Sequence, residues 1–314
     1  MYIEQAYGKK FDFFKYLPIP IMFFALMLLN YVAIAVMKID TEKLMKQQIE
    51  LSGENMVFFQ TILPLAIFLL MLLAWVKFFH KQTITSLTTA RKKVDWSRIF
   101  FSFGLWSVIT IGLTVISYFM APENFVFNFR PVPFAIMAAI AIVLIPMQTS
   151  FEEYLFRGYL MQGLGVVTRS RLFPLLFTSI AFGLMHIANP EVDKLGLTIL
   201  IYYVGTGFLL GIMTLMDDGM ELSLGFHAAN NLMTCLLVTS DWTALQTPSI
   251  LKDISQPTPS TGYDIVLPIL IIYPVLLFVF AKKYKWSGWK EKLTGKIVLP
   301  ATDNVNPNFS NNEY

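Results

Sequence analysis

Apolar runs about as long as a bilayer is thick recur along the whole chain, and they constrain its fold more than any other feature. A helix needs roughly 20 apolar residues to cross the hydrocarbon core of a membrane. We therefore expect eight membrane helices, near residues 17–37, 57–76, 99–120, 132–150, 172–188, 195–216, 221–238 and 263–281. The predicted fold class is all-α, a polytopic membrane protein with about eight transmembrane helices in one bundle.

The composition excludes an ordinary soluble domain. Hydrophobic residues make up 55% of the chain and charged residues 14%, whereas soluble domains carry roughly 25% charged residues. The single cysteine, Cys235, excludes an intrachain disulfide and a cysteine-rich metal site. The net charge of +3 is small and gives no indication of nucleic-acid binding. The expected partners are therefore the lipid bilayer and a membrane-bound protein or peptide, and the oligomeric state is left open.

The distribution of basic residues predicts the orientation of the helices. If the N-terminus is cytoplasmic, 18 of the 24 Lys and Arg residues fall in the segments on the cytoplasmic side. Cytoplasmic loops of membrane proteins carry an excess of Lys and Arg. We therefore expect a multi-pass protein of the cell membrane with both termini in the cytoplasm.

The predicted helices and loops divide the chain into four parts. Residues 1–130 hold the first three helices and a basic cytoplasmic loop, and residues 131–240 hold most of the polar residues that interrupt apolar runs. Residues 241–299 hold an external loop, with its irregular part at 255–262, and the last helix. Residues 300–314 are predicted to be a disordered polar tail.

Three clusters of ionisable and polar residues lie inside the predicted membrane region. They contain Glu152, Glu153 and Arg157, then Phe182 and His186, then His227 and Asn231. A charged side chain at the centre of a bilayer costs about 2.5 to 3.5 kcal/mol on insertion scales, so such residues generally mark a functional site. These residues are the candidate site of the chain.

The depth of the first two clusters depends on where the fourth helix ends. The sequence after Glu153 stays apolar and compatible with a helix until the break at 168–171, so we expect the helix to continue to about residue 166. Glu152 and His186 then lie on antiparallel helices, each roughly 20 Å from a turn near residue 169. The sequence therefore predicts that these two side chains lie at matching depth.

The spacing within the clusters predicts which side chains share a helix face. Residues four apart lie on the same face, so Glu153 is expected to pair with Arg157, and His227 to point with Asn231 into the bundle. Glu152 points about 100° away from Glu153. It is therefore available to act on a water molecule together with His186.

This combination of side chains is typical of hydrolysis. A carboxylate in an apolar pocket can act as general base for water, and a second histidine with an asparagine amide can stabilise an oxyanion. Glu152, His186 and His227 could equally bind a zinc ion, because two histidines and a carboxylate form a known catalytic ligand set. The sequence leaves both alternatives open.

Each of these residues also has a structural interpretation. Glu152 and Glu153 could form a helix end exposed to water, and the Arg157 side chain could extend to the membrane interface. The two histidines could be hydrogen-bonded packing residues, and Asn231 could link two helices. Three further polar residues are interpreted as structural contacts. They are Gln148, Gln162 and Asn230.

Taken together, the three clusters resemble the CPBP family of intramembrane proteases, also called the CaaX-protease and bacteriocin-processing or Abi family. The family pattern is E-E-x-x-x-R, then F-x-x-x-H, then H-x-x-x-N, and every position matches here within about residues 130–240. The resemblance implies an eight-helix protease whose site opens toward the cytoplasm.

The resemblance also implies roles for the matching residues. Glu152 would activate water with His186, and His227 with Asn231 would stabilise the oxyanion. Glu153 belongs to the same catalytic set, with a supporting role shared by two further residues. These are Arg157 and Phe182. Some members of the family are described as metalloproteases and others as glutamate-dependent, so zinc stays open as a cofactor.

The leading function is therefore an intramembrane endopeptidase of the CAAX type, acting on a membrane-associated protein or peptide. One alternative is a proton-coupled transporter, because buried Glu and His residues also form proton relays. Another is a non-catalytic immunity or scaffold protein. Within the first interpretation, the sequence does not choose between prenylated and unprenylated substrates.

Overall fold

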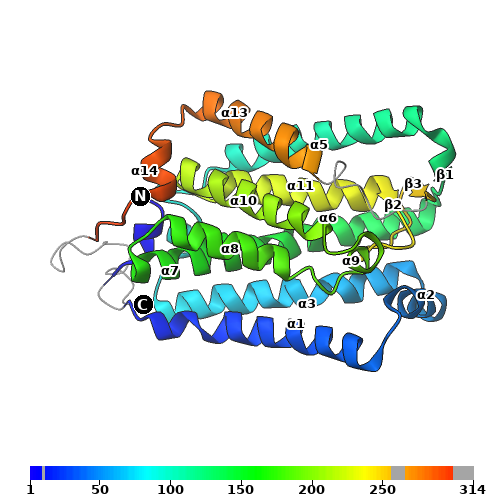
Figure 1. Cartoon of the computed structure of the whole chain (residues 1–314), viewed down its shortest axis with the longest axis horizontal. Helices are drawn as coiled ribbons and strands as arrows, with labels where there is room; N and C mark the ends of the chain where they lie inside the picture. Colours follow the sequence, from blue (N-terminus) through cyan, green and yellow to red (C-terminus); the bar gives the residue numbers. More distant parts are fainter. Residues whose placement is uncertain (9–10, 256–265, 300–314) are drawn as a thin grey trace.

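The computed structural model describes residues 1–8, 11–255 and 266–299, and its helices lie side by side along one axis (Figure 1). The N-terminus and α14 lie at one end of this bundle, and α2 and the strands lie at the other (Figure 1). The predicted irregular loop at 255–262 lies outside the described residues except for Ser255, as does the predicted tail at 300–314. The four-part division of the chain stays a prediction.

The predicted all-α membrane bundle is confirmed. Its longer helices are α1 (Pro18–Met37), α3 (Glu54–Trp75), α5 (Trp96–Met120), α6 (Pro131–Glu153), α8 (Leu172–Leu184), α10 (Ile199–Asp217), α11 (Glu221–Leu237) and α13 (Tyr273–Tyr284). The shorter ones are α2 (Thr41–Ser52), α4 (Ile84–Thr88), α7 (Met161–Thr168), α9 (Pro190–Leu195) and α14 (Trp289–Thr294). Three π-helical segments extend or interrupt the long helices at Val76–His80, Tyr154–Leu160 and Pro268–Ile272.

Five helical spans among the described residues are long and apolar enough to cross a membrane. They are Phe13–Met37, Glu54–His80, Trp96–Met120, Pro131–Thr168 and Ile199–Asp217. The helix α8 is apolar but has 13 residues, and α11 and α13 have 17 and 12. The predicted total of eight membrane helices therefore stays a prediction.

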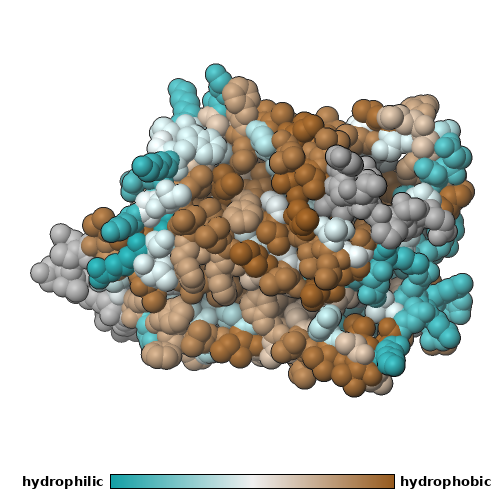
Figure 2. Space-filling model, in the orientation of Figure 1, coloured by the Kyte–Doolittle hydropathy of each residue, from teal (hydrophilic) through white to brown (hydrophobic). Residues whose placement is uncertain are grey.

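The surface has the polarity expected of a membrane protein. Apolar side chains cover the middle of the face in Figure 2, and hydrophilic ones gather at its two ends. Large apolar side chains are exposed on several of the long helices, for example Leu29 at 65% and Phe119 at 77%. Contiguous exposed apolar surface of this kind marks contact with a membrane or a partner. Contact with lipid along the bundle accounts for this exposed apolar surface.

The fourth membrane span continues past the two glutamates, as the sequence predicts. It begins with Pro131 at the first helical turn, where the missing N–H of proline costs nothing. It ends where Arg169 adopts a left-handed conformation with a φ of 50°. Between α6 and α7 the helix widens into the π-helical segment η5 (Tyr154–Leu160). Single π-turns inside α-helices are frequent at functional sites.

The returning helix is shorter than predicted, and the expected end at residue 188 is wrong. The helix α8 ends at Leu184, and His186 lies in the turn that follows. Pro190 begins α9, and the residue before a proline is disfavoured in the helical conformation. The chain therefore leaves the helix before Asn189, and His186 is held by a turn.

Two further elements, at the end of the bundle opposite the N-terminus, were not predicted (Figure 1). The polar helix α2 is capped at its N-terminus by Asp40, whose side chain accepts a hydrogen bond from the Lys43 N–H at 3.0 Å. A small sheet has the order β1-β3-β2. Its strands are β1 (Phe125–Phe127), β2 (Val238–Thr239) and β3 (Leu251–Asp253), antiparallel between β1 and β3 and parallel between β2 and β3. Strands of two or three residues are too short for a period-2 pattern to be visible in sequence.

The helices α5 and α11 pack with their backbones in contact at Gly225. A Cβ atom at this position would overlap the main-chain oxygen of Ile99 and lie 3.0 Å from the amide nitrogen of Phe103. Close to this point, the Ser102 hydroxyl donates a hydrogen bond to the Leu222 carbonyl at 2.7 Å. The position of α11, which carries His227, therefore depends on the absence of a side chain at residue 225.

A Gly225→Val substitution is expected to destabilise the protein by about 1 to 3 kcal/mol, because the added atoms meet backbone that has no room to move. Thermal unfolding in detergent, read by circular dichroism, measures this loss. Gly112→Ala on α5 is the matched control, because no atom lies within 4 Å of a Cβ there. Equal melting temperatures for the two variants would contradict the backbone contact between α5 and α11.

Candidate active site

The two adjacent glutamates are the last residues of α6, directly before the π-helical segment η5, and their side chains are buried in the bundle. Glu152 is 4% exposed and Glu153 is fully buried. A buried charge requires a partner of opposite charge and further hydrogen bonds. The partners of these two side chains differ, and that difference separates their roles.

Glu153 is the anchored member of the pair. Its Oε1 atom accepts hydrogen bonds from Arg157 at 3.0 Å and from Nδ1 of His227 at 2.8 Å. The guanidinium of Arg157 also donates to the carbonyl of Gly207 at 3.1 Å and lies 4.2 Å from the ring centroid of Phe182. The structure therefore contains the predicted pair of Glu153 and Arg157, with α10 and α8 contributing to it.

Gly207 brings α8 and α10 close enough for this arrangement. A Cβ atom on Gly207 would lie 2.6 Å from the main-chain oxygen of Ser179 on α8. Glycine allows such close approach between membrane helices. The same residue supplies the carbonyl that accepts from Arg157. A glycine at this position is a sequence signal for close helix packing, but the role of the Gly207 carbonyl as an acceptor at the site has no local signal.

Each glutamate has one oxygen without a hydrogen-bond partner among the described residues, and Glu152 is the open member of the pair because neither Arg157 nor His227 donates a hydrogen bond to it. Its Oε1 atom accepts a hydrogen bond from the amide of Gln148, one helical turn earlier. Its Oε2 atom is buried and has no hydrogen-bond partner among the described residues. That atom lies 3.6 Å from Nε2 of His227. Glu152 therefore presents one fixed oxygen and one available oxygen.

The hydrogen bonds indicate that Glu152 and His227 share one proton between their facing atoms. Glu153 is paired with Arg157, so it is an ionised carboxylate that can only accept. Nδ1 of His227 must then carry a proton, which leaves Nε2 facing Oε2 of Glu152. Two lone pairs facing each other repel, so one proton belongs to this pair, on the imidazole or on the carboxyl group. Glu152 and His227 thus form an acid–base pair.

His186 lies beside this pair, and among the described residues it forms no hydrogen bond or ion pair with Glu152. Its Nδ1 atom is 2.8 Å from the Phe182 carbonyl, and its ring stacks on Tyr203 with 4.1 Å between centroids. The rings of His186 and His227 both pack against Phe182, at 5.1 and 5.8 Å between centroids. Where the sequence predicted His186 as the partner of Glu152, the structure has His227 within ion-pair distance.

Asn231 reaches Glu152 through a residue that was interpreted as a structural contact. Its side-chain amide donates to Oε1 of Gln148 at 3.1 Å, and Gln148 donates to Glu152. His227 and Asn231 thus both reach Glu152 from α11, His227 directly and Asn231 through Gln148. The spacing of four residues between Gln148 and Glu152 was the available signal, because it places them on one helix face.

Among the described residues, the predicted zinc ligands do not come together as a set of three. No group of three or more His, Cys, Asp or Glu side chains that could hold a metal ion occurs in the described part of the chain. Glu152 and His227 offer two facing donor atoms, whereas catalytic zinc generally has three protein ligands. The predicted set of Glu152, His186 and His227 therefore stays a prediction, which metal analysis of the purified protein tests.

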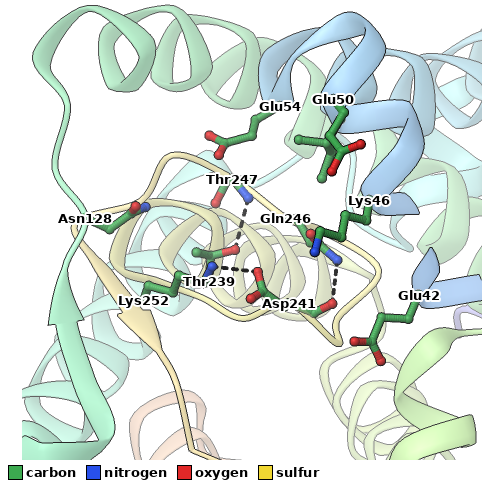
Figure 3. Close-up of a pocket in the computed structure, with 11 residues that line it drawn as sticks. Glu42, Lys46, Glu50, Glu54, Asn128, Thr239, Asp241, Gln246, Thr247 and Lys252 are labelled. Atoms are coloured by element: carbon green, nitrogen blue, oxygen red, sulfur yellow. Dashed lines mark hydrogen bonds and ion pairs between the residues drawn. The ribbon is translucent and has the colours of Figure 1, made fainter. Parts of the chain in front are cut away.

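A separate cavity of about 380 Å³ lies at the end of the bundle that carries α2 and the sheet (Figure 3). Its lining is largely charged and polar, and within it Lys252 forms an ion pair with Asp241 at 2.7 Å. None of the candidate site residues lines this cavity. It is therefore distinct from the buried glutamates and histidine.

Comparison with known proteins points to the segment of the chain that holds the candidate site. Residues 131–233 match the family model described as type II CAAX prenyl endopeptidase Rce1-like. This match confirms the resemblance to the CPBP family over the segment that holds all the predicted site residues. The uncharacterized protein YyaK of Bacillus subtilis (strain 168) is 34% identical over 165 residues, which are 52% of this chain and 55% of that protein. The chain thus spans about half the length of the curated relative it matches, and no solved structure matches it.

Proposed function

We propose that this chain is an intramembrane endopeptidase of the CAAX type, which hydrolyses a peptide bond of a membrane-associated protein or peptide. One observation carries the proposal. The buried carboxylate of Glu152 has an unpartnered oxygen that faces Nε2 of His227. The match of residues 131–233 to a family of prenyl endopeptidases gives this pair a reaction class.

In the proposed reaction, a water molecule bound at Oε2 of Glu152 attacks the carbonyl carbon of the peptide. Its proton passes to Glu152 as the new C–O bond forms. The negative charge that develops on the carbonyl oxygen is stabilised by Nε2–H of His227 and by the second amide N–H of Asn231. Glu152 then gives its proton to the leaving nitrogen as the C–N bond breaks.

The surrounding residues support these steps. Glu153 accepts from Nδ1 of His227, so its negative charge favours the protonated imidazole that the oxyanion requires. His186 uses Nδ1 for its bond to the Phe182 carbonyl, so its other ring nitrogen is available to hold the water or the leaving group. Phe182 keeps the two histidine rings in place.

We place the enzyme in the cell membrane with its basic end in the cytoplasm. The basic segments converge at the end of the bundle that carries the N-terminus. Arg91 pairs with Asp217, Lys292 with Asp218, and the main-chain N–H of Tyr2 donates to Asp218. This grouping supports the orientation that the Lys and Arg distribution predicts.

Cleavage of a quenched fluorogenic peptide by the detergent-purified full chain tests the proposal. We expect turnover by the wild-type protein, and a loss of about 100-fold or more in Glu152→Ala and in His227→Ala, since each removes a proton-transfer group. A pair of peptides with and without a C-terminal prenyl group tests the substrate class. Full activity in both variants would refute the assignment. Uptake driven by an ion gradient in liposomes, without cleavage, would instead support a transporter.

A further inference from the structure

A chain of four hydrogen bonds ends on the open glutamate, and three of its members lie outside the family motifs. The indole N–H of Trp106 donates to Asn230 at 3.1 Å, and Asn230 donates to Asn231 at 3.1 Å. Asn231 donates to Gln148 at 3.1 Å, and Gln148 donates to Oε1 of Glu152. These four hydrogen bonds therefore connect α5 through α11 to α6.

The direction of this chain is fixed by its two ends. The indole N–H of Trp106 can only donate, and the carboxylate of Glu152, in the ionised form from which the proposed reaction starts, can only accept. Each amide between them must then accept with its oxygen on the Trp106 side and donate with its nitrogen on the Glu152 side. Turning any one amide would place two donors or two acceptors against each other. The orientation of Gln148 is therefore determined by residues on two other helices.

We propose that Gln148, oriented through Asn231 and Asn230 by Trp106, is a positioning residue that selects the reactive oxygen of Glu152. This inference rests on the proposed endopeptidase function. The Gln148 amide occupies Oε1, so Oε2 is the oxygen left to bind water and face His227. Without Gln148, the carboxylate could turn about its terminal torsion, which is broad and roughly two-fold.

The same chain orients the amide of Asn231. Its oxygen accepts from Asn230, and one of its two N–H groups donates to Gln148. The remaining N–H is the donor that the proposed mechanism gives to the oxyanion. One network of hydrogen bonds thus fixes the general base, Glu152, and the oxyanion donor, Asn231, relative to each other. Hydrogen bonds that run in one direction polarise each other, so the loss of the first donor weakens the last bond.

The test compares kcat and KM of four variants of the full-length protein. We expect Gln148→Leu to lower kcat on the order of 10- to 100-fold, because it leaves Oε1 unpaired in a buried site. Gln148→Glu is expected to be at least as impaired, because it has the same length but does not donate as a carboxylate. Trp106→Phe is expected to lower kcat by only about 2- to 10-fold, since it removes a neutral bond three links away. KM is expected to change less than kcat in all three.

Ser102→Ala is the control for a purely structural role. Ser102 lies on the same face of α5 and bonds to the Leu222 carbonyl, outside the chain of amides. We expect it to lower the melting temperature and leave kcat unchanged. If Gln148→Leu behaves like Ser102→Ala, with lower stability and unchanged kcat, Gln148 has no positioning role.

A second measurement does not depend on turnover. With carbon-13 labelled glutamate, the infrared band of the Glu152 side chain is identified by its loss in Glu152→Gln. We expect this band to shift in Gln148→Leu and in Trp106→Phe, and to stay in place in Ser102→Ala, because its frequency depends on hydrogen bonding to the carboxyl group. An unshifted band in Gln148→Leu would overturn the inference even for a wild-type protein that cleaves no peptide. Absence of cleavage with the expected shift would refute the proposed function alone.

Discussion

Replacing Glu152 with glutamine is expected to lower kcat for peptide cleavage by about 1,000-fold and to leave the protein folded. The glutamine side chain has the same length and can still accept from Gln148 through its oxygen. Its nitrogen would then occupy the position of Oε2, beside Nε2 of His227. An amide nitrogen cannot take a proton from water, so the chemical step fails although the site keeps its shape.

The loss must appear in kcat to support this role. Removal of an interaction that exists only in the transition state lowers kcat and kcat/KM together. Glu50→Gln is the matched control, because Glu50 is exposed on α2 and lines the separate cavity in Figure 3. We expect it to keep wild-type kcat and KM. A Glu152→Gln protein that cleaves at the wild-type rate would show that another group activates the water.

The same variant gives a second expected result for stability. Glu152 is buried, and the only cationic partner within ion-pair distance of it in the described part of the chain is His227. Replacing it with a neutral side chain removes a buried charge, and His227 keeps Glu153 as its carboxylate partner, so no unpaired charge results. We expect the melting temperature of Glu152→Gln to equal or exceed that of the wild type. Loss of activity with retained stability distinguishes a catalytic residue from a structural one.

The continuation of the fourth span past the two glutamates could be predicted from sequence because it depends on local properties. The apolar run after Glu153 and the break near Arg169 determine where the fourth span ends, and the structure has that end at Thr168. The pair of Glu153 and Arg157 follows from a spacing of four residues on one helix. Both inferences use one helix at a time.

The partner of Glu152 could not be predicted in the same way. The choice between His186 and His227 depends on where α8 ends and on how closely α11 approaches α6. The first is set by the turn before Pro190, and the position of α11 depends on its backbone contact with α5 at Gly225. Spacing within one helix contains no information about either. The series of hydrogen bonds from Trp106 could not be predicted from sequence for the same reason, because its members come from three helices.

Replacing Arg157 with methionine is expected to cost about 3 to 5 kcal/mol of stability, the largest loss we expect for a single substitution in this protein. Arg157 is fully buried and supplies the only cation that pairs with Glu153, apart from His227, in the described part of the chain. Its removal leaves a buried carboxylate without its main counter-charge. Unfolding in mixed detergent micelles measures the change in free energy.

Arg130→Met is the matched control for the loss of an ion pair. Arg130 pairs with Glu54 near the surface, where the two side chains are 49% and 30% exposed. Exposed ion pairs contribute about 0 to 1 kcal/mol, because water and salt screen them. Equal destabilisation by Arg157→Met and Arg130→Met would contradict the buried position of the pair of Glu153 and Arg157.

The double variant Glu153→Gln/Arg157→Met separates the structural role of this pair from its effect on chemistry. Removing both charges leaves no unpaired buried ion, so we expect it to recover much of the stability that Arg157→Met loses. Its cleavage activity is expected to stay low. A glutamine at position 153 can accept from Nδ1 of His227 but carries no negative charge to favour the protonated imidazole. Recovery of stability together with full activity would instead show that Glu153 acts only as the counter-charge of Arg157, and that His227 does not need its carboxylate.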